Sequence, residues 1–246
     1  MAYTDIDDPG EYFNTVIYTG NNVAARGITG VGFQPDWVWL KDRSVGYPHI
    51  TWDSGRTNKA SLAINTTAAE VTTTARTLSS FDSDGFTTPN VTGDIFNDNG
   101  TAFVAWNWKA GTSFTNDASG TGIGNIDSAG SVNTDAGFSI ISYTGNANAD
   151  NTVAHGLGSV PKMIILKNRS ATNNWMVYHT STGAQAPLFL NLTNAAGSGD
   201  PDRFKVVPTS SVFTPGSAQE GNGNGNSIIA YCFAEKKGYS KFNSYV

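Results

Sequence analysis

The chain repeats itself, and this repetition limits the folds it can adopt more than any other feature of the sequence. Three blocks return in the same order, namely FNTVIYTGN at Phe13 as FSIISYTGN at Phe138, QPDWVWLKDRS at Gln34 as VPKMIILKNRS at Val160, and TAFVAWNWKAG at Thr101 as NSIIAYCFAEK at Asn226. Between them, LAINTT around Asn65 matches LFLNLT around Asn191. Each offset is 125 or 126 residues. A repeat of this kind predicts two copies of one structural unit.

The repeated blocks have the pattern of β-strands. Apolar residues alternate with polar ones or form short runs, and turn sequences such as YTGN, SDG at Ser83 and NDNG at Asn97 bound them. Charged residues make up only 14% of the chain, which favours strands and turns over helices. The inward-facing candidates are Val16, Tyr18, Trp37, Trp39, Phe103 and Ala105 in the first copy, and Ile141, Tyr143, Met163, Ile165, Ile229 and Tyr231 in the second. One segment, Thr66 to Thr77, has helical features, but its β-branched residues predict one or two turns at most.

These signals predict an all-β chain of two tandem antiparallel β-sandwich or jelly-roll-like domains. The predicted boundaries are an N-terminal arm at 1–12, a first repeat at 13–111, a linker at 112–137 and a second repeat at 138–246. The linker is predicted because 112–137 is small, polar and nearly free of bulky residues. Because the blocks share order and spacing, we expect the two repeats to have the same strand topology.

Charge and cysteine content exclude several classes of function. The net charge is −5 and no run of basic residues exists, so the sequence predicts no nucleic-acid partner. No apolar stretch approaches the roughly 18 residues that a membrane span needs, and the acidic start does not resemble a signal peptide, so we expect folding in a cytoplasm. Cys232 is the only cysteine. A single cysteine excludes an intramolecular disulfide and a thiolate zinc cage. We expect Cys232 to lie in the core.

The residues that catalysis or metal binding would need are sparse. The three histidines, His49, His155 and His179, have no metal-ligand spacing, and no serine stands in a nucleophile elbow. Two acidic turns are weighed as calcium sites, Asp82 with Asp84 and Asp94 with Asp98, but ordinary Asp-Gly turns explain them better. The run GNGNGN at 221–226 has no lysine after it and predicts a flexible hairpin tip. We therefore assign no catalytic, cofactor-binding or metal-binding residue and expect no cofactor.

Tryptophan supplies the remaining functional signal. The chain has six, which is many for its length: Trp37, Trp39, Trp52, Trp106, Trp108 and Trp175. Tryptophan stacks on sugar rings and anchors protein interfaces. Strand alternation predicts that most of these rings belong to the core. A sugar-binding platform, which would need aromatic residues on loops or on an outer sheet face, stays open as an alternative.

The ordered motifs resemble a repeated domain in structural proteins of tailed phages, especially those of marine bacteria. The resemblance covers nearly the whole chain and is carried by IDDPGEYFNTVIYTGN, GFQPDWVWLKDRS, SFDSDGFT, FVAWNWKAG, NTDAGFSIISYTGN, HGLGSVPKMIILKNRS and AYCFAEKKGYSKFNSY. It implies a non-enzymatic virion protein, assembled in the host cytoplasm and placed on the outer surface as capsid decoration or tail appendage. The implied partners are capsid or tail subunits and further copies of the chain, without nucleic acid or membrane insertion. A lectin-like adhesin for host-surface glycans and an endoglycosidase-like enzyme remain alternatives.

The chain ends carry an expectation about assembly. Met1 to Glu11 is acidic and cannot build a core alone, so we expect contacts to order it. Tyr239 to Val246 alternates apolar and polar residues over the length of a strand. Strand addition by such ends predicts a homo-oligomer such as a trimer, or a subunit bound in a lattice.

Overall fold

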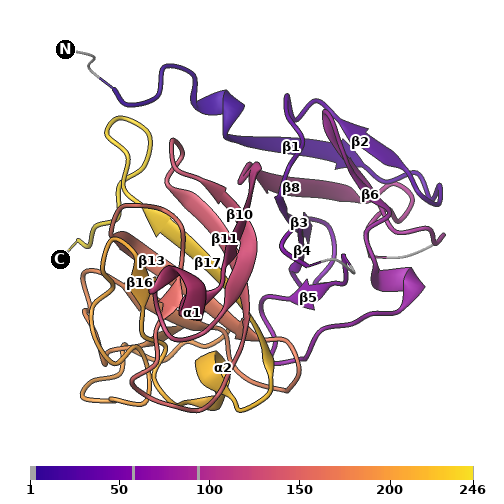
Figure 1. Ribbon diagram of the computed structural model, residues 1–246. Helices are drawn as coiled ribbons and strands as arrows, with labels where there is room; N and C mark the ends of the chain where they lie inside the picture. The colour runs from indigo at the N-terminus through magenta and orange to yellow at the C-terminus, as the bar shows by residue number, and fades with distance from the viewer. Residues whose placement is uncertain (1–3, 57–58, 93–94, 246) are drawn as a thin grey trace.

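Two large antiparallel sheets form the frame of the protein (Figure 1). The computed structural model describes residues 4–56, 59–92 and 95–245. The first sheet has five strands in the spatial order β1 (Phe13–Thr19), β8 (Ala102–Trp108), β3 (Trp37–Asp42), β4 (Ile50–Asp53) and β5 (Leu62–Ala63). The second sheet has seven strands in the order β15 (Leu188–Phe189), β14 (Met176–His179), β13 (Pro161–Asn168), β17 (Ser227–Ala234), β11 (Phe138–Thr144), β10 (Ser128–Asn133) and β9 (Thr112–Asn116).

Smaller elements surround these sheets. A three-stranded sheet has the order β2 (Gly27–Thr29), β7 (Gly85–Thr87) and β6 (Ser80–Asp82), and β12 (Val153–Ala154) pairs with β16 (Val212–Phe213). The helices of the described residues are short: η1 (Pro9–Glu11), η2 (Thr74–Arg76), α1 (Ala118–Thr121) and α2 (Gln219–Asn222). The single 3₁₀ turn η2 agrees with the prediction of one or two helical turns between residues 66 and 77.

Both large sheets contain the same five-stranded unit. The order β1-β8-β3-β4-β5 in the first repeat returns as β11-β17-β13-β14-β15 in the second. The registers also agree: Val16 lies opposite Ala105 as Ile141 lies opposite Ala230. The prediction of two tandem antiparallel β domains with one topology is therefore confirmed.

The segment 112–137 is not the linker that its composition predicted. It forms β9, α1 and β10, and β10 pairs with β11 along its whole length, so both strands extend the second sheet. Small residues are needed here because the backbones approach closely. A Cβ on Gly130 would lie 1.8 Å from the carbonyl oxygen of Ile140. Small polar residues therefore form strands at this edge through main-chain pairing rather than side-chain bulk.

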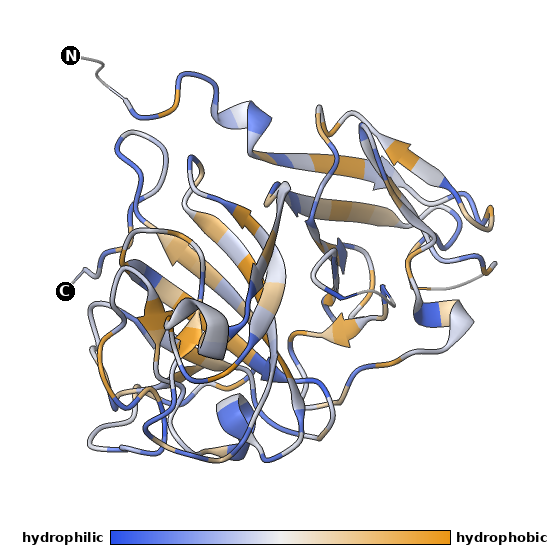
Figure 2. Cartoon of the chain, in the orientation of Figure 1, coloured by the Kyte–Doolittle hydropathy of each residue, from blue (hydrophilic) through white to orange (hydrophobic). Residues whose placement is uncertain are grey.

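The buried apolar residues form three clusters, two of which belong to one repeat each. The first repeat has its own cluster around Trp52, Phe86 and Phe103, and the second has one around Phe213 and Cys232. The third, called the central cluster here, joins the two sheets and contains Trp37, Leu62, Ile64, Ala110, Ala136, Phe138, Ile140, Ile165, Trp175, Val177, Ile229 and Tyr231. Figure 2 shows that hydrophobic positions follow the strands and hydrophilic ones the loops around them. The second sheet is thus covered on both faces, which explains the consecutive buried residues of β11 and β17.

The loop that follows β17 lies against the N-terminal arm (Figure 1). The N–H of Asp5 donates to the carbonyl oxygen of Lys237 at 2.9 Å, and Tyr12 contacts the ring of Tyr239. Residues 1–3 of the predicted arm and residue 246 lie outside the described residues. The strand expected at the C-terminus is wrong for residues 239–245, which form only the end of a turn with an isolated bridge between Lys236 and Ser240. The described part of the N-terminal arm is ordered by contact, as expected, but the contact is within the chain.

Candidate functional site

The histidines are held apart by separate structural contacts. Nδ1 of His49 accepts the indole N–H of Trp39 at 3.0 Å, and Nδ1 of His179 accepts the N–H of Ser181 at 3.2 Å. His155 is fully buried between the N–H of Leu157 and the carbonyl oxygen of Thr209. Within the described residues, no group of three or more His, Cys, Asp or Glu side chains stands in a position to hold a metal ion.

Burial of His155 makes stability depend on pH. Burial lowers the pKa of His155 from its ordinary 6.5 to about 4, because the charged imidazolium is poorly solvated there. Since the folded pKa lies below the unfolded one, the contribution of the neutral ring is fully present above pH 6.5 and is lost as the pH falls toward 4. The free energy of unfolding should fall between pH 7.5 and pH 4.5 by about 2–3 kcal/mol less in His155→Gln than in the unchanged chain. Urea denaturation at the two pH values measures this difference. An unchanged difference would contradict this role of His155.

The acidic turns use their carboxylates to fix the backbone. Asp84 accepts the N–H groups of Gly30 at 3.1 Å and Gly32 at 2.6 Å, and these bonds lower its pKa. Asp82 accepts the hydroxyls of Ser80 and Thr87. Asp98 accepts the N–H of Asn99, while Asp94 lies outside the described residues. These contacts agree with ordinary turns, as the sequence indicated.

The GNGNGN run is not the flexible tip that we expected. Gly221 and Asn222 belong to α2, and Asn222 is completely buried. Its amide donates to the carbonyl oxygens of Asn148 and Gly216, at 2.9 and 2.7 Å, and accepts the N–H of Asn146. Asn97 makes the corresponding contacts with Asn21 and Val23 in the first repeat. The run therefore joins loops of the second repeat, a role that a buried, fully bonded amide can fill.

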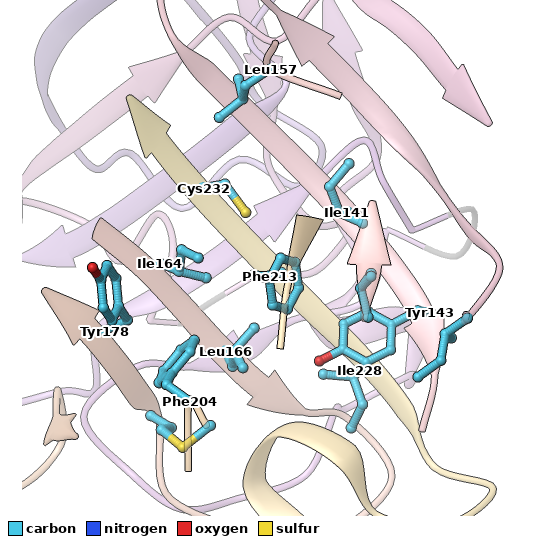
Figure 3. Close-up of a cluster of buried hydrophobic side chains, with 14 of the residues drawn as sticks. Ile141, Tyr143, Leu157, Ile164, Leu166, Tyr178, Phe204, Phe213, Ile228 and Cys232 are labelled. Atoms are coloured by element: carbon cyan, nitrogen blue, oxygen red, sulfur yellow. The ribbon is translucent and has the colours of Figure 1, made fainter. Parts of the chain in front are cut away.

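Cys232 lies in the core of the second repeat. Figure 3 shows its sulfur among Ile141, Leu157, Ile164 and Phe213. Burial raises the pKa of the thiol to about 12, which keeps it protonated. The prediction of a core cysteine is confirmed.

The tryptophans divide into a buried and a half-buried group. Trp37, Trp52 and Trp175 are at most 1% exposed, whereas Trp39, Trp106 and Trp108 are half-buried. Trp37 is the centre of the central cluster, with ring centroids 4.2 Å from Tyr231 and 4.4 Å from Trp108. Most of the rings contribute to cores, in agreement with the strand alternation.

An aromatic groove of about 320 Å³ borders the central cluster. Its lining is Phe13, Trp37, Trp39, Trp108, Ala136, Phe138, Met163, Ile165, Phe233, Ala234, Tyr239, Ser240 and Phe242. The indole N–H groups of Trp37 and Trp39 are already bonded to Thr51 and His49. Apart from indoles, the polar side chains on this lining are the hydroxyls of Tyr239 and Ser240. The groove is suited to apolar or aromatic groups rather than to a ligand that needs many hydrogen bonds.

A buried ionic network also connects the two repeats. The guanidinium of Arg56 contacts Asp53 at 2.8 Å and Glu70 at 3.2 Å, and Glu70 contacts Arg169 at 2.5 Å. The hydroxyl of Tyr231 donates to Asp53 at 2.6 Å. Burial acts most strongly, against the charge of Arg56, but Asp53, Tyr231 and Glu70 together outweigh it, and the pKa of Arg56 is raised. The sequence gives no local pattern that predicts this network, because Arg169 lies 99 residues from Glu70.

The fold and these contacts define a tandem-repeat, all-β protein whose two sheets share one core. A family model described as Domain of unknown function (DUF7483) matches residues 8–246, and the chain belongs to that family. No curated protein and no solved structure matches the chain. Within the described residues, no helix is long and apolar enough to cross a membrane.

Proposed function

We propose that this protein is a non-enzymatic structural subunit of a bacteriophage particle, on its outer surface as capsid decoration or tail appendage. The observation that carries the proposal is that the candidate reactive side chains bond to other parts of the same chain. His49, His155, Asp82 and Asp84 hold turns and strands of the chain itself. The phage-protein motifs, which run through both repeats, support the particle and the host cytoplasm as the place of assembly.

The shared core also suits a structural role. Trp37 and Tyr231 stack between the sheets, and Glu70, which Arg56 also contacts, pairs with Arg169 of the second repeat. Close packing between the two sheets makes the chain a rigid body. Its partners are capsid or tail subunits and further copies of itself.

Antibody labelling of intact particles tests the placement. Antibodies raised against the purified chain, followed by electron microscopy, are expected to label the outside of particles at regular positions. Labelling that appears only after the particles are broken open would contradict the outer-surface placement. The purified chain is also expected to release no sugar from host-surface glycans; release that Asp82→Asn or Asp84→Asn abolishes would contradict the non-enzymatic role.

A glycan-binding adhesin is the second candidate, and the aromatic groove is the feature that favours it. Aromatic rings stack on sugars, and Trp39 and Trp108 line the groove. The scarcity of polar side chains on the lining favours the structural role instead. A glycan array tests this candidate. Binding by the purified chain that is lost in Trp39→Ala would favour the adhesin, whereas absence of binding would support the structural subunit.

A further inference from the structure

The contact between the repeats has two parts on the side of the first repeat. One is Trp37, which stacks on Tyr231, and the other is residues 60–71, named here the docking segment. The carbonyl oxygen of Ala63 accepts the indole N–H of Trp175 at 3.1 Å, and that of Thr67 accepts the ammonium of Lys167 at 3.0 Å. Glu70 adds the ion pair with Arg169. The docking segment therefore meets a surface of the second repeat that is not its own counterpart, so this part of the contact is heterologous.

The second repeat contributes an apolar receiving face. It consists of Ile140, Ile165, Trp175, Ile229 and Tyr231. Each of these side chains is at most 4% exposed, because the first repeat covers them. Leu62 and Ile64 of the docking segment are members of the same cluster.

The corresponding face of the first repeat is covered only in part, since Trp39 at one side of it packs against the central cluster. The residues at the matching positions, 125 or 126 earlier, are Thr15, Trp39, His49, Val104 and Trp106. Thr15 is exposed and the other four are half-buried. Ile17, which pairs with Val104 across β1 and β8 and so shares its face, is 69% exposed. An apolar surface that is buried in one repeat is thus only partly covered in the other.

The docking segment of the second repeat is open from residue 190 onward, whereas Leu188 before it packs against the central cluster. It spans residues 186–197, and residues 192–196 are all exposed. Leu190 stands at the position of Ile64 and is 39% exposed, whereas Ile64 is 2% exposed. Leu192, at the position of Thr66, is 43% exposed. Each chain therefore has an unused stretch of docking segment, residues 190–196, and an unused part of the receiving face around Trp106.

We propose that these two unused surfaces bind each other between copies of the chain, so that residues 190–196 of one molecule seat on the face around Trp106 of the next. The internal contact shows that one repeat of this fold fits another in this way. A heterologous contact of this kind closes into a ring or continues as a filament. The inference deepens, and rests on, the proposed function by naming the partner and the surface of a repeated virion subunit.

One difference between the two contacts gives a sharp test. Ala196 stands at the position of Glu70, while Arg43, which is exposed, stands at the position of Arg169. The contact between molecules therefore lacks the ion pair and is expected to be weaker than the internal one. Ala196→Glu supplies the missing carboxylate and is expected to tighten association by at least about three-fold. Adding Arg43→Glu should cancel this gain, because it replaces attraction by repulsion.

A second pair of variants tests the apolar part. Sedimentation velocity of the purified full chain over a range of concentrations is expected to show masses that are multiples of 26.0 kDa. L190D/L192D should weaken association by at least about ten-fold, because charges would be buried in the contact. The matched control is V206D/V207D, which changes two exposed apolar residues outside both surfaces, 51% and 58% exposed, and should associate as the unchanged chain does.

The outcomes separate this inference from the proposed function. A chain that stays monomeric at all concentrations, or that is weakened equally by both aspartate pairs, overturns the inference. Binding of a glycan at Trp39 and Trp106 by a chain that does not associate also overturns it. Absence from phage particles of a chain that associates as described would instead overturn the proposed function alone.

Discussion

Replacing Trp37 by alanine is expected to lower the free energy of unfolding by about 3–5 kcal/mol. The side chain is 1% exposed, and its ring stacks between those of Tyr231 and Trp108, so its loss leaves a cavity between the two sheets. Because the central cluster includes residues of both repeats, the loss should affect the stability of the whole chain. Urea denaturation followed by circular dichroism measures the change.

Tyr245→Ala is the control for this variant. Tyr245 is 99% exposed, so removing its aromatic ring should change the free energy of unfolding by no more than about 0.5 kcal/mol. A loss below about 1 kcal/mol in Trp37→Ala would mean that the two sheets do not share a core.

Arg56→Met is the second substitution with a large expected effect. The side chains of Arg56 and Asp53 are both fully buried, and the substitution leaves Asp53 with the hydroxyl of Tyr231 but without its cation. An unpaired buried charge of this kind costs about 3–5 kcal/mol. The double variant Asp53→Asn/Arg56→Met should recover part of the loss, because it removes the charge that lost its partner. Urea denaturation of both variants measures this coupling.

Arg203 provides a matched control. It also contacts two carboxylates, those of Asp200 and Glu220, but its side chain is 28% exposed. Arg203→Met is therefore expected to cost about 1 kcal/mol or less. Equal losses in Arg56→Met and Arg203→Met would show that burial of the interdomain network does not matter for stability.

The repeat made the strand order predictable, because the same blocks must form the same strands in both halves. Val16 and Ile141, for example, have matching partners in matching strands. The face that each residue occupies was harder to predict. Ile229 and Tyr231 lie in the central cluster, while Ile228 and Ala230 next to them lie in the cluster of the second repeat. Alternation of apolar and polar residues marks the buried face of a strand only where the other face meets water. Neither face of the second sheet meets water at β17.

Contacts between segments far apart in the sequence were not predictable. The strands β9 and β10 contain too few bulky residues to give an apolar pattern, and their pairing depends on close backbone approach at Gly130. The partners Glu70 and Arg169 meet only because the two repeats pack together.

Quantitative mass spectrometry of purified phage particles tests the central claim most directly, that this chain is a repeated structural part of the particle. Particles would be washed in high salt and treated with nuclease, and the chain would be counted against the major capsid protein. We expect the chain to remain in many copies per particle. A chain that is abundant in the infected-cell lysate but absent from the washed particles would contradict it.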